Sequence, residues 1–355
     1  MVFKQFQHEE GACLSYILGC TTKHVCAVVE PQLDIEQYLE YAKAKGMEIT
    51  HVFETHAQAD HLSGAKRLAE ATHAPVYYHE SANAAFPVRK VRDGETIDIG
   101  NIQLRILYTP GHTPDSISIV VTDMTRSREP WFVLTGDTLF VGDTGRPDLD
   151  GSAEQLYESI YEKLLRLDDS VEVFPSHYAG SVCGKALSPK PSSTIGFERR
   201  FNPSLQFESK EKFVQFVTEN LPVQPPRFHK VRQFNLGFLK EPPIEKTFDI
   251  KALQITVEEL KQRMDVGDRP FLLDVREPQE YEICNLNAPL IPLQQLPKRL
   301  QELDPGKEIV VYCHTGSRSQ QAVEFLYESG FKNVKSLVGG VAAWAQKIDP
   351  SMPRY

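Results

Sequence analysis

The sequence has no uninterrupted apolar run of about 18 to 20 residues, the length that a membrane-spanning helix needs. Its first residues also lack the apolar core and the small-residue cleavage site of a secretory signal peptide. We therefore expect a cytoplasmic protein with no membrane partner. The six cysteines show neither zinc-finger spacing nor the spacing of a disulfide framework, so they are interpreted as reduced thiols.

The chain is also short of positive charge. It has 39 lysines and arginines against 48 aspartates and glutamates, a net charge of -9, and a pI of about 5.7. Because proteins that follow a phosphate backbone carry basic surfaces, we expect no nucleic-acid partner. With 41% apolar and 25% charged residues the composition excludes wholesale disorder, and 355 residues predict about two domains.

A proline-rich segment marks the expected division between the domains. Residues 222–246 contain five prolines and little apolar periodicity, which is typical of a connecting segment. Thr256 and Glu259 then have the spacing of a helix capping box, which predicts a helix start. We therefore predict a first domain at 1–230, a linker at 231–252 and a second domain at 253–355.

Apolar, β-branched runs of the first domain end abruptly in polar loops. These runs are residues 51–54, 104–108, 131–134 and 171–174. Each is followed within a few residues by a histidine or an aspartate, namely His56, His112, Asp137 and His177. Polar groups at four strand ends predict one shared site on loops above a sheet edge. Imidazole and carboxylate groups are the usual ligands of iron, zinc and manganese.

Residues 55–61, THAQADH, together with the later segments around His112, Asp137 and His177, resemble the metallo-β-lactamase fold. The resemblance covers about residues 1–230 and implies an α/β protein, an αβ/βα sandwich with metal at one edge. Typical hydrolases of that fold carry His-x-His-x-Asp-His and bind two zinc ions. In this sequence Gln58 stands at the second histidine of the motif, and a neutral amide is a poor ligand for zinc or ferrous iron.

If the first metal position of the fold is used, its protein ligands reduce to His56, His112 and Asp137. Two histidines and one carboxylate form the facial triad of non-haem iron enzymes, which leaves room for substrate and dioxygen together. A hydrolytic zinc site needs one open position for water. The sequence therefore resembles the persulfide dioxygenase branch of the fold. That resemblance implies one Fe(II), with glutathione persulfide and O2 as substrates and sulfite and glutathione as products.

The same resemblance assigns supporting groups around the iron ligands. Asp60, His61 and His177 are expected to orient the ligands; the alternative is a second metal that they would hold with Asp137. Tyr178 is expected to hydrogen-bond an iron-bound group.

A glutathione persulfide also needs an anchor for its carboxylates. Arg146, on a loop soon after Asp137, is the expected residue. Arg199, Arg200 and Lys185 are weaker candidates.

The second domain begins with a helix and has two buried-type strands, residues 271–275 and 309–312, each followed by a helix. This order predicts a small parallel α/β unit. The second strand leads into Cys313, which is followed by a loop and another helix. Backbone N–H groups of such a loop converge on an anion at a helix start, and the same field makes a thiol nucleophilic. The expected loop residues are His314, Thr315, Gly316, Ser317 and Arg318.

The length of this loop separates two chemistries. Cysteine-dependent phosphatases of related shape have five residues between cysteine and arginine, whereas here there are four. The tighter loop, the segment LDVRE at 273–277 and the segment GGVAAW at 339–344 resemble rhodanese sulfurtransferases over about residues 253–355. The resemblance implies a Cys313 persulfide, stabilised by Arg318 and by the loop amides. Sulfur is expected to move between thiosulfate and glutathione through Cys313, and the sequence leaves the direction of this transfer open.

Together the two resemblances predict a persulfide dioxygenase–rhodanese fusion that acts in sulfur metabolism. One alternative is a binuclear zinc thioester hydrolase of the glyoxalase II type with an appended sulfurtransferase. Another is a persulfide sensor, with Cys313 as a signalling thiol. Enzymes of this kind are most often dimers, so a homodimer is the default expectation, although no residue shows it.

Overall fold

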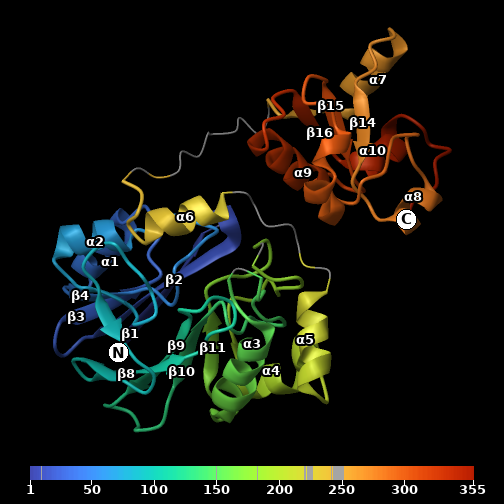
Figure 1. Ribbon diagram of the computed structural model, residues 1–355. Coiled ribbons are helices and arrows are strands. Elements are labelled where there is room, and N and C mark those ends of the chain that lie inside the picture. The colour runs from blue at the N-terminus through green and yellow to red at the C-terminus, as the bar shows by residue number, and fades with distance from the viewer. Residues whose placement is uncertain are drawn as a thin grey trace. The chain divides into compact units, whose positions relative to one another are not determined.

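The computed structural model describes residues 1–8, 10–148, 150–181, 183–219, 221, 227–240, 242 and 252–355. The described residues form two compact units, one up to residue 242 and one from residue 252 onwards (Figure 1). No helix in these described ranges combines the length and the apolar character that crossing a bilayer requires.

The first sheet of the larger unit has six strands among the described residues, paired in sequence order. Its first three strands pair antiparallel and the remaining ones parallel. The strands are β1 (Val2–His8), β2 (Cys13–Cys20), β3 (Val25–Val29), β4 (Glu48–Phe53), β5 (Val76–His79) and β6 (Arg89–Val91).

The second sheet also has six described strands, in the order β12-β11-β10-β9-β8-β7. Only β10 and β11 pair in parallel among them. The strands are β7 (Thr96–Ile99), β8 (Ile102–Tyr108), β9 (Ile117–Asp123), β10 (Phe132–Gly136), β11 (Glu172–Pro175) and β12 (Ser193–Thr194). The four runs expected to be strands thus coincide with β4, β8, β10 and β11.

Helices cover the outer faces of the two sheets (Figure 1). Those on the first sheet are α1 (Glu36–Ala44), α2 (Ala65–Thr72) and α6 (Phe228–Asn235). Those on the second sheet are α3 (Ala153–Glu158), α4 (Ile195–Phe201) and α5 (Lys210–Thr218), with a π-helical turn at Ser159–Lys163 after α3. This layering is the αβ/βα sandwich that the resemblance to the metallo-β-lactamase fold implies.

The alternation of β2 shows why the layers form. Tyr16 and Leu18 face the second sheet and join the apolar core between the sheets, whereas Ile17 faces the helices. All eight residues of β2 are buried, because both faces of the strand are covered. Each large apolar side chain buried in this way contributes about 1.5–3 kcal/mol. A third core joins the second sheet to α3 and α5.

Helix α6 belongs to the larger unit, so the boundary predicted at residue 230 falls inside a helix. The side-chain amide of Asn235 donates to the main-chain oxygens of Gln58 and His61, both at 2.9 Å. Leu236 packs into the core under the first sheet. The range 231–252, interpreted as a linker, therefore begins with folded structure; most of residues 241–251 lie outside the described residues.

The second unit is a parallel sheet of four described strands in the order β13-β16-β15-β14. The capping box predicted at Thr256 and Glu259 is confirmed at the start of its first helix. Its elements are β13 (Gln254–Ile255), α7 (Val257–Asp265), β14 (Phe271–Asp274), α8 (Pro278–Ile283), β15 (Ile309–Tyr312), α9 (Ser317–Glu328), β16 (Val334–Leu337) and α10 (Gly340–Lys347).

Candidate functional site

The histidines and the aspartate that follow strand ends meet at one edge of the sandwich. Strands β8, β10 and β11 run in the same direction, so the loops after them leave the second sheet at one side. The loop after β4 of the first sheet adds His56. The structure brings His56, His112 and Asp137 within 4.8 Å of one another, counted between possible ligand atoms.

Each of the three side chains directs one possible ligand atom toward the other two. Asp137 Oδ2 lies 3.5 Å from His112 Nε2 and 3.9 Å from His56 Nε2, and all three side chains are buried. Asp137 Oδ2 has no hydrogen-bond partner among the described residues. A buried carboxylate oxygen without a partner is costly, whereas a cation between this oxygen and the two nitrogens would satisfy it. The three residues therefore fit a metal ion.

Main-chain and hydroxyl groups fix the orientation of the two imidazoles. His112 Nδ1 lies 2.8 Å from the carbonyl oxygen of Arg146. Because a carbonyl only accepts, Nδ1 carries the proton and Nε2 keeps a free lone pair. His56 Nδ1 lies 3.1 Å from Thr55 Oγ1, which leaves His56 Nε2 toward Asp137. Both rings are thus set to bind a metal through Nε2.

The sequence reasoning missed Glu30, which binds the residues that contact the His56 ring. Its buried carboxylate accepts from the N–H of Thr55 at 3.1 Å and from Gln58 Nε2 at 2.6 Å, and it also binds the Thr55 hydroxyl. Gln58 Nε2 lies 3.4 Å from His56 Nδ1, on the side of the ring opposite Nε2. Gln58 is therefore positioned behind His56. The available signal was the charged residue directly after the apolar run 25–29.

This network makes Glu30→Ala a test of the support around His56. The substitution leaves the Thr55 and Gln58 donors unpaired in a buried place, at about 1–3 kcal/mol each, and loosens the His56 ring. We expect metal affinity to fall about 10- to 100-fold, as is typical when a partner of a ligand is removed. Titration with Fe(II) under anaerobic conditions measures it. Glu40→Ala on exposed α1 is the matched control; an equal loss there would contradict the role of Glu30.

Burial sets the protonation of the ligands. It lowers the pKa of His56 to about 4 and also lowers the pKa of His112. Burial alone would raise the pKa of Asp137, but the charge and hydrogen bond of His177 lower that pKa to about 2. Near neutral pH the site thus offers two neutral imidazoles and one carboxylate, the protonation states in which these groups bind metal.

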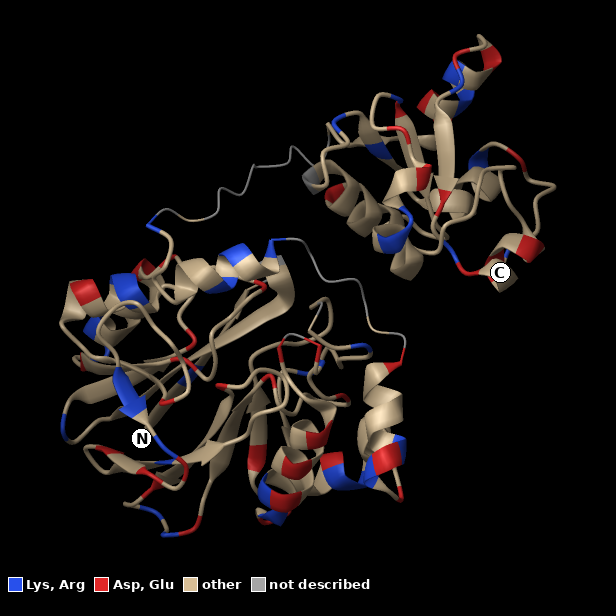
Figure 2. Ribbon diagram, in the orientation of Figure 1, with Lys and Arg blue, Asp and Glu red and all other residues tan. Residues whose placement is uncertain are grey.

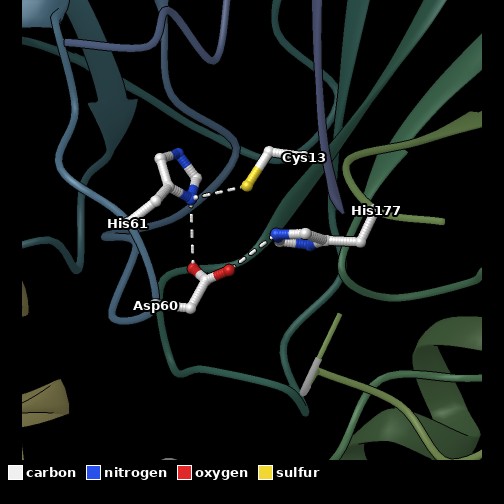
Figure 3. A group of neighbouring side chains, drawn as sticks. All are labelled: Cys13, Asp60, His61 and His177. Atoms are coloured by element: carbon white, nitrogen blue, oxygen red, sulfur yellow. Dashed lines mark hydrogen bonds and ion pairs between the residues drawn. The ribbon is translucent and has the colours of Figure 1, made fainter. Parts of the chain in front are cut away.

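A second group of side chains lies beside the triad: Cys13, Asp60, His61 and His177 (Figure 3). His177 connects the two groups, because its Nδ1 lies 2.7 Å from Asp137 Oδ1 and its Nε2 lies 2.7 Å from Asp60 Oδ2. His61 Nδ1 lies 3.1 Å from Asp60 Oδ1 and 3.6 Å from Cys13 Sγ. Cys13, at the start of β2, was interpreted from sequence only as a reduced thiol.

The residues that were expected to support the ligands differ in what they contact. His177 contacts Asp137 directly, whereas Asp60 contacts His177 and His61 rather than the triad imidazoles. The hydroxyl of Tyr178 donates to the main-chain oxygen of His8 at 3.2 Å, so it is engaged by the backbone.

The proposed carboxylate anchors are engaged as well. The buried guanidinium of Arg146 binds both carboxylate oxygens of Asp148 at 2.7 and 2.8 Å. Arg199 and Arg200 both pair with Asp169. Figure 2 shows acidic and basic residues interspersed along α3 to α5. Lys185 donates to the main-chain oxygen of Phe216 at 2.6 Å. The geometry thus gives each of these cations a protein partner.

The cysteine loop of the second unit runs from the end of β15 to the start of α9. Gly316 has φ +103°, a conformation that favours glycine, and its N–H donates to Cys313 Sγ at 3.1 Å. The thiol is 1% exposed and lies 3.7 Å from Ser319 Oγ. Ser319 was missed by the sequence reasoning. Thr315 and Ser317 are exposed at the rim of the loop.

The start of α10 holds this loop in place. The N–H groups of Val341 and Ala342 donate to the carbonyl oxygens of Cys313 and His314, both at 3.0 Å. A Cβ at Gly340 would overlap these two carbonyls, so only glycine permits the approach. The expected landmark GGVAAW therefore acts as a backbone support for the cysteine loop.

Arg318 was expected to point its charge at the sulfur of Cys313. In the structure its guanidinium forms a bidentate pair with Glu280, with both N–O distances at 2.6 Å. The hydrogen bonds from Arg318 lower the pKa of Glu280 to about 2. The hydroxyl of Tyr355 also reaches Glu280, at 3.2 Å, and its ring stacks on that of His314 with centroids 4.2 Å apart. Glu280 and Tyr355 were missed by the sequence reasoning.

An αβ/βα sandwich with a His-His-Asp site that fits a metal ion, followed by a parallel unit with a cysteine loop, defines a two-domain class of protein. Comparison with known families agrees with both parts. Residues 9–177 match the metallo-beta-lactamase superfamily and residues 256–347 match the rhodanese-like domain. The chain belongs to the metallo-beta-lactamase superfamily and carries a C-terminal rhodanese-like domain.

Individual relatives agree with this assignment. The chain is 28% identical over 226 residues to the mitochondrial persulfide dioxygenase ETHE1 of Bos taurus, covering 62% of this chain and 83% of that protein. The crystal structure of ETHE1 from Myxococcus xanthus is 31% identical, with a TM-score of 0.58, and covers 66% of this chain and 99% of that one. A metallo-beta-lactamase crystal structure from Staphylococcus aureus is 26% identical, with a TM-score of 0.63, and covers 95% and 99%.

Proposed function

We propose that the chain is a bifunctional enzyme of sulfur metabolism. Its first unit would oxidise glutathione persulfide with O2 and water to sulfite and glutathione. Its second unit would transfer sulfur between thiosulfate and glutathione through a Cys313 persulfide. The observation that carries the oxidation is the unpartnered Asp137 Oδ2 facing two imidazole nitrogens. Similarity to persulfide dioxygenases and to rhodanese-like domains supports sulfur as the element handled.

His56, His112 and Asp137 would hold one ferrous ion, which supplies the activation of dioxygen beside the persulfide. Other residues of the chain orient these ligands. The carbonyl of Arg146 holds His112 in the tautomer that leaves Nε2 free. His177 binds the second carboxylate oxygen of Asp137 at 2.7 Å, which keeps Oδ2 directed at the two imidazoles. All three ligand residues are buried, which restricts the rotamers that their side chains can adopt.

In the second unit Cys313 is the proposed nucleophile for sulfur transfer. The N–H of Gly316 already donates to its sulfur, and the loop opens at the N-terminus of α9. These dipoles favour negative charge on the sulfur and on a terminal sulfur carried by it. The exposed rim residues Thr315 and Ser317 would contact an incoming thiosulfate.

Oxygen uptake by iron-loaded protein given glutathione persulfide is the test of the first activity, with sulfite assayed in parallel. Uptake matched by sulfite would support the dioxygenase. Absence of uptake with glutathione persulfide and with other thiol persulfides would contradict it.

The group Cys13, Asp60, His61 and His177 favours a second candidate, a binuclear zinc thioester hydrolase. These residues lie close enough for a second metal ion. The two candidates differ in metal content and in substrate. Two zinc ions per chain together with turnover of S-lactoylglutathione would establish the hydrolase, whereas one iron per chain without that turnover would exclude it.

The Glu280–Arg318 pair leads to a prediction for thiosulfate. Glu280 places a negative charge beside the cysteine loop and compensates Arg318. Glu280→Gln keeps the shape but removes the charge, so we expect the KM for the thiosulfate dianion to fall about two- to fivefold, the range of one partly exposed ion pair. Steady-state kinetics of thiosulfate sulfurtransfer measure it. Glu302→Gln, whose carboxylate pairs with Arg299 instead, is the matched control; a rise in KM for Glu280→Gln would contradict the prediction.

A further inference from the structure

A cavity of about 320 Å³ lies beside the cysteine loop. Neither Cys313 nor any residue of the His56, His112 and Asp137 triad lines it. Its wall includes His314 of the loop, Gln346 of α10, and Cys284, Arg354 and Tyr355. Its volume lies at the lower end of the range of sites for small organic molecules, about 300–1,000 Å³. A thiosulfate ion, with five heavy atoms, would leave most of this space empty.

The charge of the cavity wall favours an anionic ligand. Arg354 is the only residue with a formally charged side chain among the described residues that line the cavity. Its guanidinium donates to the main-chain oxygen of Ala345 at 3.1 Å, and no carboxylate in the described ranges forms an ion pair with it. The neighbouring Arg276 and Arg318 are compensated, by Asp274 and Glu280. An arginine fork left without a counter-charge is a suitable partner for a carboxylate.

Tyr355 connects the cavity to the reacting loop. Its ring stacks on His314, the residue after Cys313, with an interplanar angle of 12°. Its hydroxyl accepts from Arg276 Nη1 at 2.8 Å and donates to Glu280 at 3.2 Å. Val341 and Ala345 add apolar surface to the cavity wall. The cavity thus combines an anion partner, an apolar wall and a direct contact with the loop that carries the nucleophile.

We propose that this cavity binds the non-reacting part of the thiol that exchanges sulfur with Cys313, and that Arg354 selects thiols bearing a carboxylate. The inference rests on the proposed sulfurtransferase function. In the transfer, the thiolate RS⁻ attacks the terminal sulfur of Cys313–S–SH. The new S–S bond forms as the bond to Cys313 Sγ breaks, and the electron pair stays on the Cys313 thiolate. The products are R–S–SH and the free thiolate enzyme, with no net oxidation.

Arg354→Gln tests the selection. We expect the KM for glutathione to rise about two- to fivefold, the effect of one exposed ion pair, with kcat unchanged. The KM for 2-mercaptoethanol, which has no carboxylate, should stay the same. Arg269→Gln is the matched control, since it removes the same charge from an exposed position that does not line the cavity. A KM increase of equal size for both thiols, or for the control, would overturn the proposal.

A binding measurement without turnover separates this inference from the proposed function. Cys284 lines the cavity, so unreactive S-methylglutathione should slow the alkylation of Cys284, read at the peptide level by mass spectrometry. The protection should be lost in Arg354→Gln. Absence of protection in the unmodified chain would overturn the cavity as a thiol site. Failure of thiosulfate to form a Cys313 persulfide in any variant would instead overturn the sulfurtransferase itself.

Discussion

We expect His112→Ala to abolish metal binding and oxygen uptake of the first unit while sulfur transfer at Cys313 continues. His112 supplies one of three ligand atoms, and its removal leaves His56 and Asp137 alone with the cation. Iron affinity should fall at least about 100-fold, more than the loss of a group that only supports a ligand. Oxygen uptake should fall to background. Metal analysis and an oxygen electrode measure the two quantities on the same preparation.

The second activity serves as the internal control for this variant. The two units are compact by themselves and have separate cores, so the substitution should change thiosulfate sulfurtransfer by no more than about twofold. His229→Ala, on the exposed side of α6, is the matched control for losing an imidazole. Retention of one iron per chain in His112→Ala would remove the triad as the metal site. Loss of both activities in a variant whose Tm is unchanged would contradict the independence of the units.

The proximity of His56, His112 and Asp137 could be predicted because these residues follow strand ends, and strands that run in one direction place these ends at one edge of a sheet. Asp137 directly follows β10, and His177 follows β11 by two residues. Short loops of this kind leave little freedom in where the residue lies. The sequence pattern and the fold therefore lead to the same site.

The supporting residues could not be predicted, because they approach from other strands or depend on side-chain direction. Glu30 reaches Thr55 because β3 and β4 pair in parallel, and its N–H donates to the carbonyl of Phe53 at 2.9 Å. Sequence spacing does not give that register. Arg318 shows the second difficulty: its position in the loop was clear, but a long flexible side chain also reaches Glu280 of α8.

The structure gives Gln58 a different role from the one expected, but it leaves the three proposed ligands unchanged. From sequence it was a ligand position filled by a poor ligand. In the structure its amide binds Glu30 behind the His56 ring, so it acts on the orientation of His56. The number of ligand atoms at the triad is the same in both readings. The proposal of iron therefore depends on the triad itself, two imidazoles and one carboxylate.

Cys313→Ser is the reciprocal of the histidine variant and should have an effect of similar size on the other activity. A serine hydroxyl is not ionised near neutral pH and has no sulfur with which to form a persulfide. We therefore expect thiosulfate sulfurtransfer to fall by at least about 1,000-fold, the scale typical of removing a catalytic nucleophile. Oxidation of added glutathione persulfide should remain within about twofold, because Cys313 lies in the other compact unit. Mass spectrometry should find no persulfide on the peptide that contains residue 313.

Cys20→Ser is the matched control for this variant. Its sulfur accepts from the N–H of Asn101 at 3.3 Å, a bond that a serine oxygen can replace, and it lies in the first unit. Both activities should survive in that variant. Sulfurtransfer that persists in Cys313→Ser would move the nucleophile to another thiol. A loss of persulfide oxidation in Cys313→Ser would show instead that the oxidised sulfur passes through Cys313, and the two units would then act in sequence rather than independently.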